Sequence, residues 1–148
     1  MGRPTLDALP HRDPFRFLSS IVSLEPDISG TALWNVTGDE AFFDGHFPGN
    51  PLVPGVLLTE SLAQLSGMVA FSNGQSEGPT PAHLAQADMK FRHAICPPAA
   101  ITLHSQLTRR MGNLCVFDVQ AMADDIVAAD GTVVLSLHVN DTHQEGTV

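Results

Sequence analysis

A histidine and a glutamate, fourteen positions apart, are the residues of this chain best suited to do chemistry. His46 lies in a segment rich in glycine and proline, residues 44–55, where proline fixes φ and glycine lets a ligand approach the backbone. Glu60 follows within a run of mostly apolar residues. An imidazole and a carboxyl group so placed suit general acid and base catalysis, because one can take a proton while the other gives one.

The apolar run over residues 56–71 must position Glu60. Apolar side chains occur on nearly every side of this run, which predicts a buried helix rather than a surface helix. Gln64 lies one turn after Glu60 on the same helical face. We therefore expect Glu60 in a medium of low dielectric, where a carboxylate is costly unless it is paired, hydrogen-bonded or protonated.

The rest of the chain predicts a sheet around this helix. The expected strands are residues 17–24, 29–37, 84–91, 101–110, 114–123 and 133–139. Turns are expected at residues 25–27, 111–113 and 130–131, and an exposed loop at residues 72–81. Residues 38–43 predict a short helical turn capped by Asp39. One long helix among about six antiparallel strands predicts an α+β fold, a curved sheet whose edges invite pairing with a second copy.

Composition limits the class of protein. A length of 148 residues with 43% hydrophobic residues fits one globular domain, residues 1–148. No apolar run spans a membrane without polar interruption, and no secretory leader is recognisable, so we expect a cytoplasmic protein. Cys96 and Cys115 predict neither a disulfide framework nor a zinc site and are interpreted as small core residues. The net charge of −9 argues against nucleic acid as a partner.

The few basic residues are unevenly distributed. Four of them, Lys90, Arg92, Arg109 and Arg110, come from two segments of the second half of the chain. One interpretation is a local basic patch that docks an anionic partner. The other is a solvated face that balances acidic neighbours.

Three stretches of the chain carry a family resemblance. They are Leu9-Pro10-His11-Arg12-Asp13-Pro14-Phe15, then Phe42-Phe43-Asp44-Gly45-His46-Phe47-Pro48-Gly49 with Pro51-Leu52-Val53-Pro54-Gly55-Val56-Leu57, and finally Glu60-Ser61-Leu62-Ala63-Gln64. The first resembles the LPHRYPF opening, and the last resembles the E-A-M-A-Q helix, of the hotdog-fold 3-hydroxyacyl-[acyl-carrier-protein] dehydratases of the FabZ type. The resemblance covers about residues 9–140.

This resemblance implies an activity and a role for each residue. The reaction would be dehydration of a 3-hydroxyacyl thioester to the trans-2-enoyl thioester. His46 would take the proton from C2, and Glu60 would give a proton to the departing 3-hydroxyl group. The residues expected to contact the substrate are Phe47, Pro54, Gly55 and Gln64. Of these, Gly55 would hydrogen-bond the thioester carbonyl through its N–H, and Gln64 would orient Glu60.

The resemblance also implies partners. The substrate would arrive on an acyl carrier protein with its phosphopantetheine arm, so no separate cofactor or metal is expected. In this family the site lies across a homodimer interface, and three dimers often form a hexamer; a heteromer with a paralogue is an alternative. The remaining histidines show no metal-ligand spacing and are interpreted as structural or exposed: His11, His83, His93, His104, His138 and His143.

Departures from the family pattern leave rival functions open. Asp13 replaces the usual tyrosine of the opening motif, and the chain has no tyrosine at all. These departures bear on acyl chain length and on gating of the acyl tunnel. The rivals are a dehydratase/isomerase of the FabA type, which usually has aspartate in place of Glu60, a hotdog thioesterase, and a non-catalytic or heteromeric subunit that binds acyl carriers.

Overall fold

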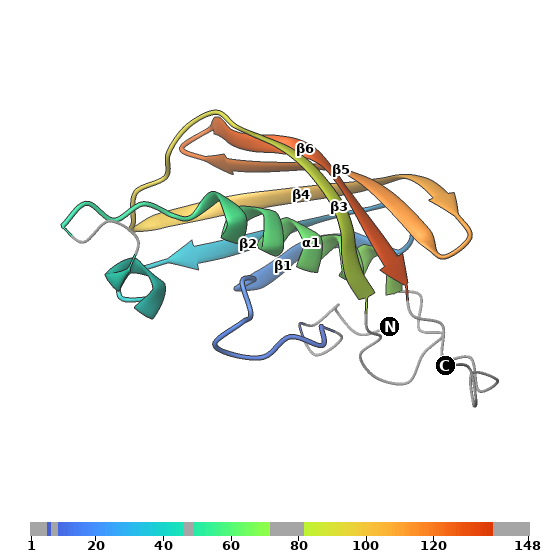
Figure 1. Ribbon diagram of the computed structural model, residues 1–148, viewed down its shortest axis with the longest axis horizontal. Helices are drawn as coiled ribbons and strands as arrows, with labels where there is room; N and C mark the ends of the chain where they lie inside the picture. The colour runs from blue at the N-terminus through green and yellow to red at the C-terminus, as the bar shows by residue number, and fades with distance from the viewer. Residues whose placement is uncertain (1–5, 7–8, 46–48, 72–81, 138–148) are drawn as a thin grey trace.

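A curved six-stranded sheet organises the computed structural model, which describes residues 6, 9–45, 49–71 and 82–137. The strands are β1 (Ser20–Glu25), β2 (Ser29–Val36), β3 (Ala82–Phe91), β4 (Ala99–Met111), β5 (Leu114–Ala123) and β6 (Ile126–Leu137). Their order is β1-β2-β4-β5-β6-β3, and every neighbouring pair is antiparallel. The sheet curves round one long helix, α1 (Gly55–Phe71), as Figure 1 shows. The predicted α+β hotdog fold is confirmed.

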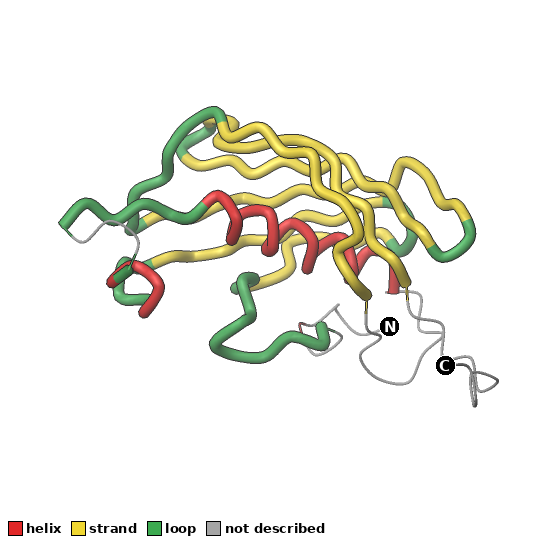
Figure 2. Tube along the Cα trace, in the orientation of Figure 1, coloured by secondary structure: helices red, strands yellow, loops and turns green. Residues whose placement is uncertain are grey.

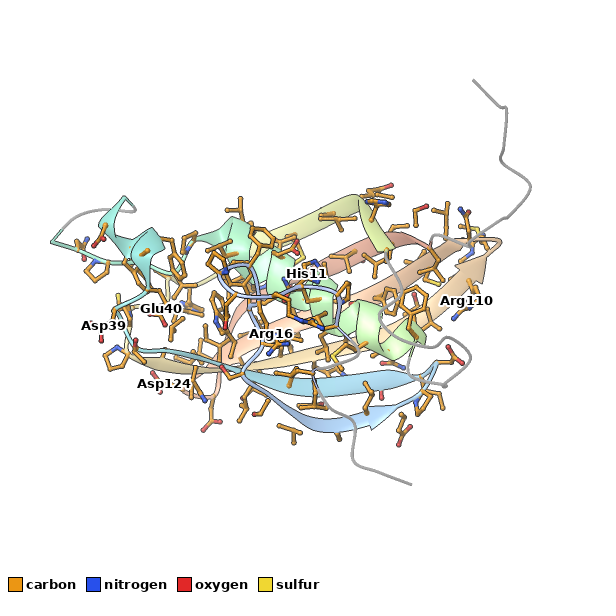
Figure 3. The ribbon with its side chains drawn as sticks, turned by 90° about the horizontal axis from the view of Figure 1, so that it is seen from below. His11, Arg16, Asp39, Glu40, Arg110 and Asp124 are labelled. Carbon is orange, nitrogen blue, oxygen red and sulfur yellow. The ribbon has the colours of Figure 1, made fainter. Side chains whose placement is uncertain are left out.

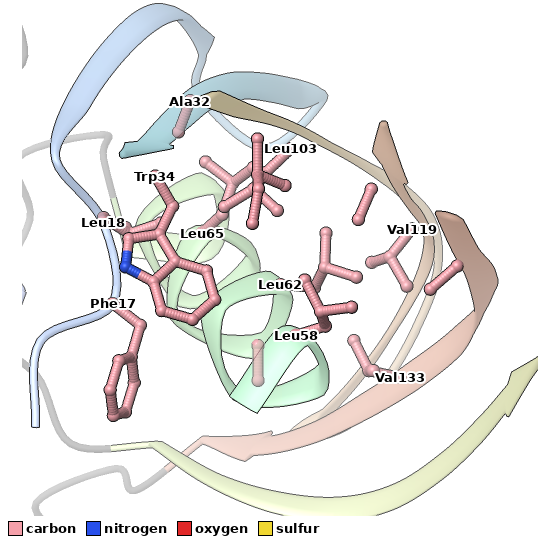
Figure 4. Close-up of a cluster of buried hydrophobic side chains, with 14 of the residues drawn as sticks. Phe17, Leu18, Ala32, Trp34, Leu58, Leu62, Leu65, Leu103, Val119 and Val133 are labelled. Atoms are coloured by element: carbon pink, nitrogen blue, oxygen red, sulfur yellow. The ribbon is translucent and has the colours of Figure 1, made fainter. Parts of the chain in front are cut away.

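Helix α1 lies on the concave side of the sheet (Figure 2). Leu62 and Leu65 are fully buried and lie between Trp34 of β2 and the inward side chains of β4 to β6 (Figure 4). Burying each such side chain contributes roughly 1.5–3 kcal/mol, so the apolar run must be enclosed. The predicted buried helix is confirmed, although Val56 in its first turn is 76% exposed. In the described part of the chain, no helix is long and apolar enough to cross a membrane.

The inner strands alternate between core and solvent as predicted. In β4, Ile101, Leu103 and Ser105 are buried while Thr102 and His104 between them are exposed, because successive side chains point to opposite faces. The Ser105 hydroxyl lies 2.6 Å from that of Ser66 on α1, so neither buried oxygen lacks a partner. Strand β5 has the predicted bounds, and its alternate side chains Cys115, Phe117, Val119 and Ala121 are buried.

The turn predicted at Asp130 and Gly131 is wrong. Both residues lie inside β6, and the chain reverses at Asp124 and Asp125, whose φ angles are 52° and 61°. Two consecutive positive φ values match the two-residue hairpin turn that follows the natural twist of antiparallel strands. Gly131 is instead a site of close backbone approach: a Cβ there would lie 2.1 Å from the Asp88 carbonyl oxygen on β3.

The short helix before the candidate site forms, but Asp39 does not cap it. The 3-10 helix η2 (Ala41–Asp44) has Glu40 at its N-cap position. The Glu40 carboxylate accepts hydrogen bonds from the Thr37 N–H at 3.0 Å and the Gly38 N–H at 2.9 Å. Desolvation alone would raise the pKa of Glu40, but these backbone donors outweigh it, so its pKa lies below the ordinary value.

The two cysteines differ in environment. Cys115 is a buried core residue, as predicted, and burial raises the pKa of its thiol. Cys96 is exposed, so its interpretation as a core residue is wrong. Both thiols are free.

Candidate active site

Gln64 attaches the N-terminal segment to helix α1. Its side-chain Oε1 accepts a hydrogen bond from the Phe17 N–H at 2.9 Å, and its Nε2 donates to the Phe15 carbonyl at 3.0 Å. Gln64 is 1% exposed, so these bonds satisfy an amide group that burial would otherwise penalise. The two backbone bonds also fix which end of the amide faces Glu60.

The Glu60 carboxyl group receives two contacts on one oxygen. The Gln64 Nε2 donates to Glu60 Oε1 at 3.2 Å, as the one-turn spacing on α1 allows. His11 Nε2 lies 3.3 Å from the same Oε1. The Glu60 side chain is 21% exposed in the single chain, so it is less buried than the apolar run predicts. Among the described contacts Oε2 takes none.

His11 is the residue that the sequence interpretation missed. We read it as structural or exposed, whereas the structure places it against Glu60 with a 30% exposed side chain. Its ring stacks on Phe15, with ring centroids 6.3 Å apart. The only indication in the sequence is its place in the opening motif, since nothing local connects it with a helix that begins at Gly55.

Gly55 is the first residue of α1 and lies under an aromatic ring. A Cβ at Gly55 would stand 3.0 Å from Phe91 Cε1, closer than ordinary side-chain contacts. The Pro54 carbonyl accepts hydrogen bonds from the N–H groups of Leu57 and Leu58 at 3.0 and 3.1 Å. The first N–H groups of a helix have no partner inside it and present partial positive charge. Gly55 therefore combines close packing with a backbone donor at a helix N-terminus.

Two predicted site residues, His46 and Phe47, lie outside the described residues. The flanking glycines are described. Gly45 follows η2, and Gly49 has a φ of +81°, a backbone conformation that residues with a side chain rarely adopt. Pro54, the other predicted substrate contact, is buried next to Val53, whose N–H donates to the Ile95 carbonyl at 2.8 Å.

A cleft of about 630 Å³ lies between the N-terminal segment, β2, η2 and the first turn of α1. Its lining includes Leu57, one turn before Glu60 on α1, and aromatic side chains from three segments: Phe15, Phe17, Trp34 and Phe42. Phe17 is the centre of this group, with ring centroids 5.5 Å from Trp34 and 6.4 Å from Phe42. Arg16 also lines the cleft, and its Nε is buried without a hydrogen-bond partner among the described residues. A cleft of this size and apolar lining can take an acyl chain.

The four basic residues proposed for docking do not form one patch within the chain. The strand register shows how far apart they lie. Arg110 on β4 is opposite Cys115 on β5, which is opposite Leu135 on β6, which in turn is opposite Leu84 on β3. Lys90 lies further along β3 than Leu84, roughly 20 Å at about 3.3 Å per residue.

Two of these arginines also have acidic partners. Arg92 makes a two-pronged ion pair with Asp130 at 3.0 and 3.1 Å, and Arg110 pairs with Asp27 at 3.0 Å. The two segments that carry these basic residues, 90–92 and 109–110, thus lie apart within the chain, and docking of a carrier on either one stays a prediction.

The described residues hold no group of three or more histidine, cysteine, aspartate or glutamate side chains that could bind a metal ion. His104, an exposed histidine on β4, forms a hydrogen bond instead: its Nδ1 lies 3.1 Å from the Thr31 hydroxyl on the neighbouring strand β2.

Comparison of the sequence with known proteins shows its family. Residues 9–132 match the family model of the FabA-like domain. The chain belongs to the FabA-like family. This FabA-like chain is 35% identical over 132 residues to the 3-hydroxyacyl-[acyl-carrier-protein] dehydratase FabZ of Lactococcus lactis subsp. cremoris, covering 89% of this chain and 91% of the relative. It is also 35% identical to the FabZ protein of Anaplasma phagocytophilum, covering 92% and 96% of the two chains.

Solved structures show the same fold at lower sequence identity. The dehydratase heterocomplex ApeI:P from Xenorhabdus doucetiae superposes with a TM-score of 0.78 at 15% identity, covering 94% of both chains. A hypothetical thioesterase from Streptococcus pneumoniae, solved with coenzyme A, superposes with a TM-score of 0.64 at 16% identity, covering 80% of this FabA-like chain and 84% of the other. At such identities the likeness shows the fold alone.

Proposed function

We propose that this chain dehydrates 3-hydroxyacyl-[acyl-carrier-protein] thioesters to trans-2-enoyl thioesters, in fatty-acid biosynthesis or a related acyl pathway. The observation that carries the proposal is the 35% identity to FabZ dehydratases, which extends over 89% of this chain and 91% of the Lactococcus relative. The contacts of Glu60 with Gln64 and His11 support it, because they hold a carboxyl group in a fixed place on α1, the helix whose Leu57 lines an acyl-sized cleft.

His46 and Glu60 carry out the two proton transfers. The thioester carbonyl acidifies C2, and His46 removes a proton from it. The C3–O bond breaks as the double bond between C2 and C3 forms, and Glu60 gives its proton to the departing hydroxyl, which leaves as water. Proton exchange with solvent then returns His46 to its neutral form and Glu60 to its protonated form. Acid and base of this kind contribute about 10²–10⁴-fold each.

The start of α1 stabilises the charge that develops on the thioester oxygen. The Gly55 N–H donates to that oxygen, and the aligned peptide dipoles of the helix favour the negative charge of the enolate. Gln64 orients Glu60 through its hydrogen bond to Oε1, and the family resemblance assigns contacts with the substrate to Pro54 and Phe47.

A second copy of the chain completes the enzyme. Strand β3 is paired with β6 on one side, is the last strand in the sheet order, and is exposed along most of its length. Leu84 and Phe91 on this strand are exposed apolar side chains. Pairing of β3 with its copy would cover this edge. We infer a homodimer with each site shared between protomers, which accepts an acyl carrier protein and needs no cofactor besides the phosphopantetheine of the substrate.

The test is to incubate the purified protein with 3-hydroxyacyl-carrier substrates of several chain lengths and follow intact mass. A loss of one water from the acyl-carrier species is the expected result. Loss of the whole acyl group, which leaves the carrier with a free phosphopantetheine thiol, would show a thioesterase instead. If the protein binds the acyl carrier but the carrier's mass does not change, while a FabZ protein is active under the same conditions, the chain is a non-catalytic subunit that binds the carrier.

A further inference from the structure

The N-terminal segment places the imidazole of His11 next to the side-chain carboxyl group of Glu60 on α1. His11 Nε2 lies 3.3 Å from Glu60 Oε1, the same oxygen that receives the Gln64 amide. Figure 3 shows His11 where this segment crosses the helix. The segment is fixed on both sides of His11: Gln64 holds Phe15 and Phe17, and Arg12 Nη1 donates to the carbonyls of Leu9 and His11.

The other ring nitrogen of His11 identifies the tautomer. Nδ1 is buried and has no hydrogen-bond partner among the described residues. A proton on Nδ1 would be a buried donor without an acceptor, which is costly, whereas a bare Nδ1 leaves only an unused lone pair. A neutral imidazole with its proton on Nε2 fits these two observations, because Nε2 is the ring nitrogen that faces Glu60 Oε1, at 3.3 Å. The guanidinium of Arg12, the residue after His11, donates to the two backbone carbonyls.

We propose that His11 is a positioning residue for Glu60. Together with Gln64 it occupies Oε1, so that the transferable proton resides on Oε2 and faces the 3-hydroxyl of the substrate. A neutral imidazole suits this task, because a cation on Oε1 would favour the carboxylate and weaken Glu60 as an acid. This inference rests on the proposed function and adds one residue to the machinery of that reaction.

Two amide variants of His11 separate positioning from a structural role. In His11→Gln the side-chain amide reaches about as far as Nε2 and can still donate to Oε1, whereas in His11→Asn it reaches only about as far as Nδ1. We expect His11→Gln to keep kcat within about threefold of wild type, and His11→Asn to lose about tenfold or more in kcat with little change in KM, since misplaced catalytic groups lower turnover. In a Glu60→Gln background, His11→Asn should cause no further loss.

The outcomes are distinct. Equal kcat for both amide variants and wild type would overturn the positioning role, and so would an equal loss in both accompanied by a raised KM or a lowered Tm. A wild-type protein without dehydratase activity would refute the proposed function itself. The intact-mass assay of the wild-type protein tests this separately, before any variant is compared.

A spectroscopic test on the wild-type protein does not depend on whether His11→Asn folds. The ring ¹⁵N shifts of His11 in the wild-type protein, assigned by loss of the signals in His11→Gln, should show the neutral form protonated at Nε2 at neutral pH. A proton on Nδ1, or the cation, would contradict the proposal even if the Asn variant proves unstable.

Discussion

Phe91 of β3 packs closely over Gly55 of α1, because a Cβ there would stand 3.0 Å from its Cε1. The ring is 53% exposed, so it can swing away with little loss of packing. The contact brings together the start of the helix and the end of an edge strand, where the proposed oxyanion donor lies. It also allows the two roles of Gly55, packing and approach of substrate, to be separated by mutation.

Gly55→Ala should change the free energy of unfolding by no more than about 1 kcal/mol, since Phe91 can move. The same variant should lower kcat by about tenfold or more, because its methyl group keeps the thioester from the N–H. The double variant Gly55→Ala/Phe91→Ala removes the ring as a cause. Its turnover should stay low relative to Phe91→Ala alone, and full recovery would reduce Gly55 to a packing residue.

His46→Ala and Glu60→Gln should each lower dehydration by at least about a hundredfold without loss of the fold. Turnover of purified variants, with circular dichroism as the check on folding, measures this. The double variant should be far less than multiplicatively worse, because the two groups act in one step. A folded single variant with near-wild-type turnover would exclude that residue from the mechanism.

Mixing inactive His46→Ala chains with inactive Glu60→Gln chains should restore part of the activity if each site is shared between protomers. A mixed dimer then contains one site with both groups intact. Native mass spectrometry reports whether heterodimers form, and wild-type chains mixed in the same way give the reference. Heterodimers that remain inactive would place both groups in one protomer.

Charge reversal should locate the surface that receives the carrier. We compare Lys90→Glu/Arg92→Glu with Arg109→Glu/Arg110→Glu, because the structure separates these pairs along the sheet. Charge reversal of the pair that docks the carrier should raise KM for the carrier-bound substrate. It should also make this KM less dependent on salt, since salt screens exposed charges. A short pantetheine thioester serves as the control and should change little. Equal losses on both substrates would indicate damage to the site.

Gly131→Ala should destabilise the protein by about 2 kcal/mol, within the usual range for overpacking. The added Cβ would lie 2.1 Å from the Asp88 carbonyl oxygen, and backbone cannot move aside as a flexible side chain can. Urea unfolding monitored by Trp34 fluorescence measures this change. Gly45→Ala is the matched control and should be nearly neutral, because no atom of the described residues other than its chain neighbours lies within 4 Å of the added Cβ.

Local patterns determined much of this protein from the sequence alone. The apolar run that becomes α1, the alternation in β4 and β5, and the Glu60–Gln64 pair were all predictable, because each depends on residues within a few positions of one another. The candidate chemistry of Glu60 could also be stated, since its residue type and neighbours are local facts.

Only the tertiary structure decided the contacts between distant segments. Asp130 and Gly131 read as a turn, but pairing with β3 keeps them inside β6, and Arg92 finds Asp130 through the same register. His11 meets Glu60 because Gln64 holds the N-terminal segment against the helix. Register and segment packing are set by the burial of whole faces, a global quantity that no short stretch of sequence contains.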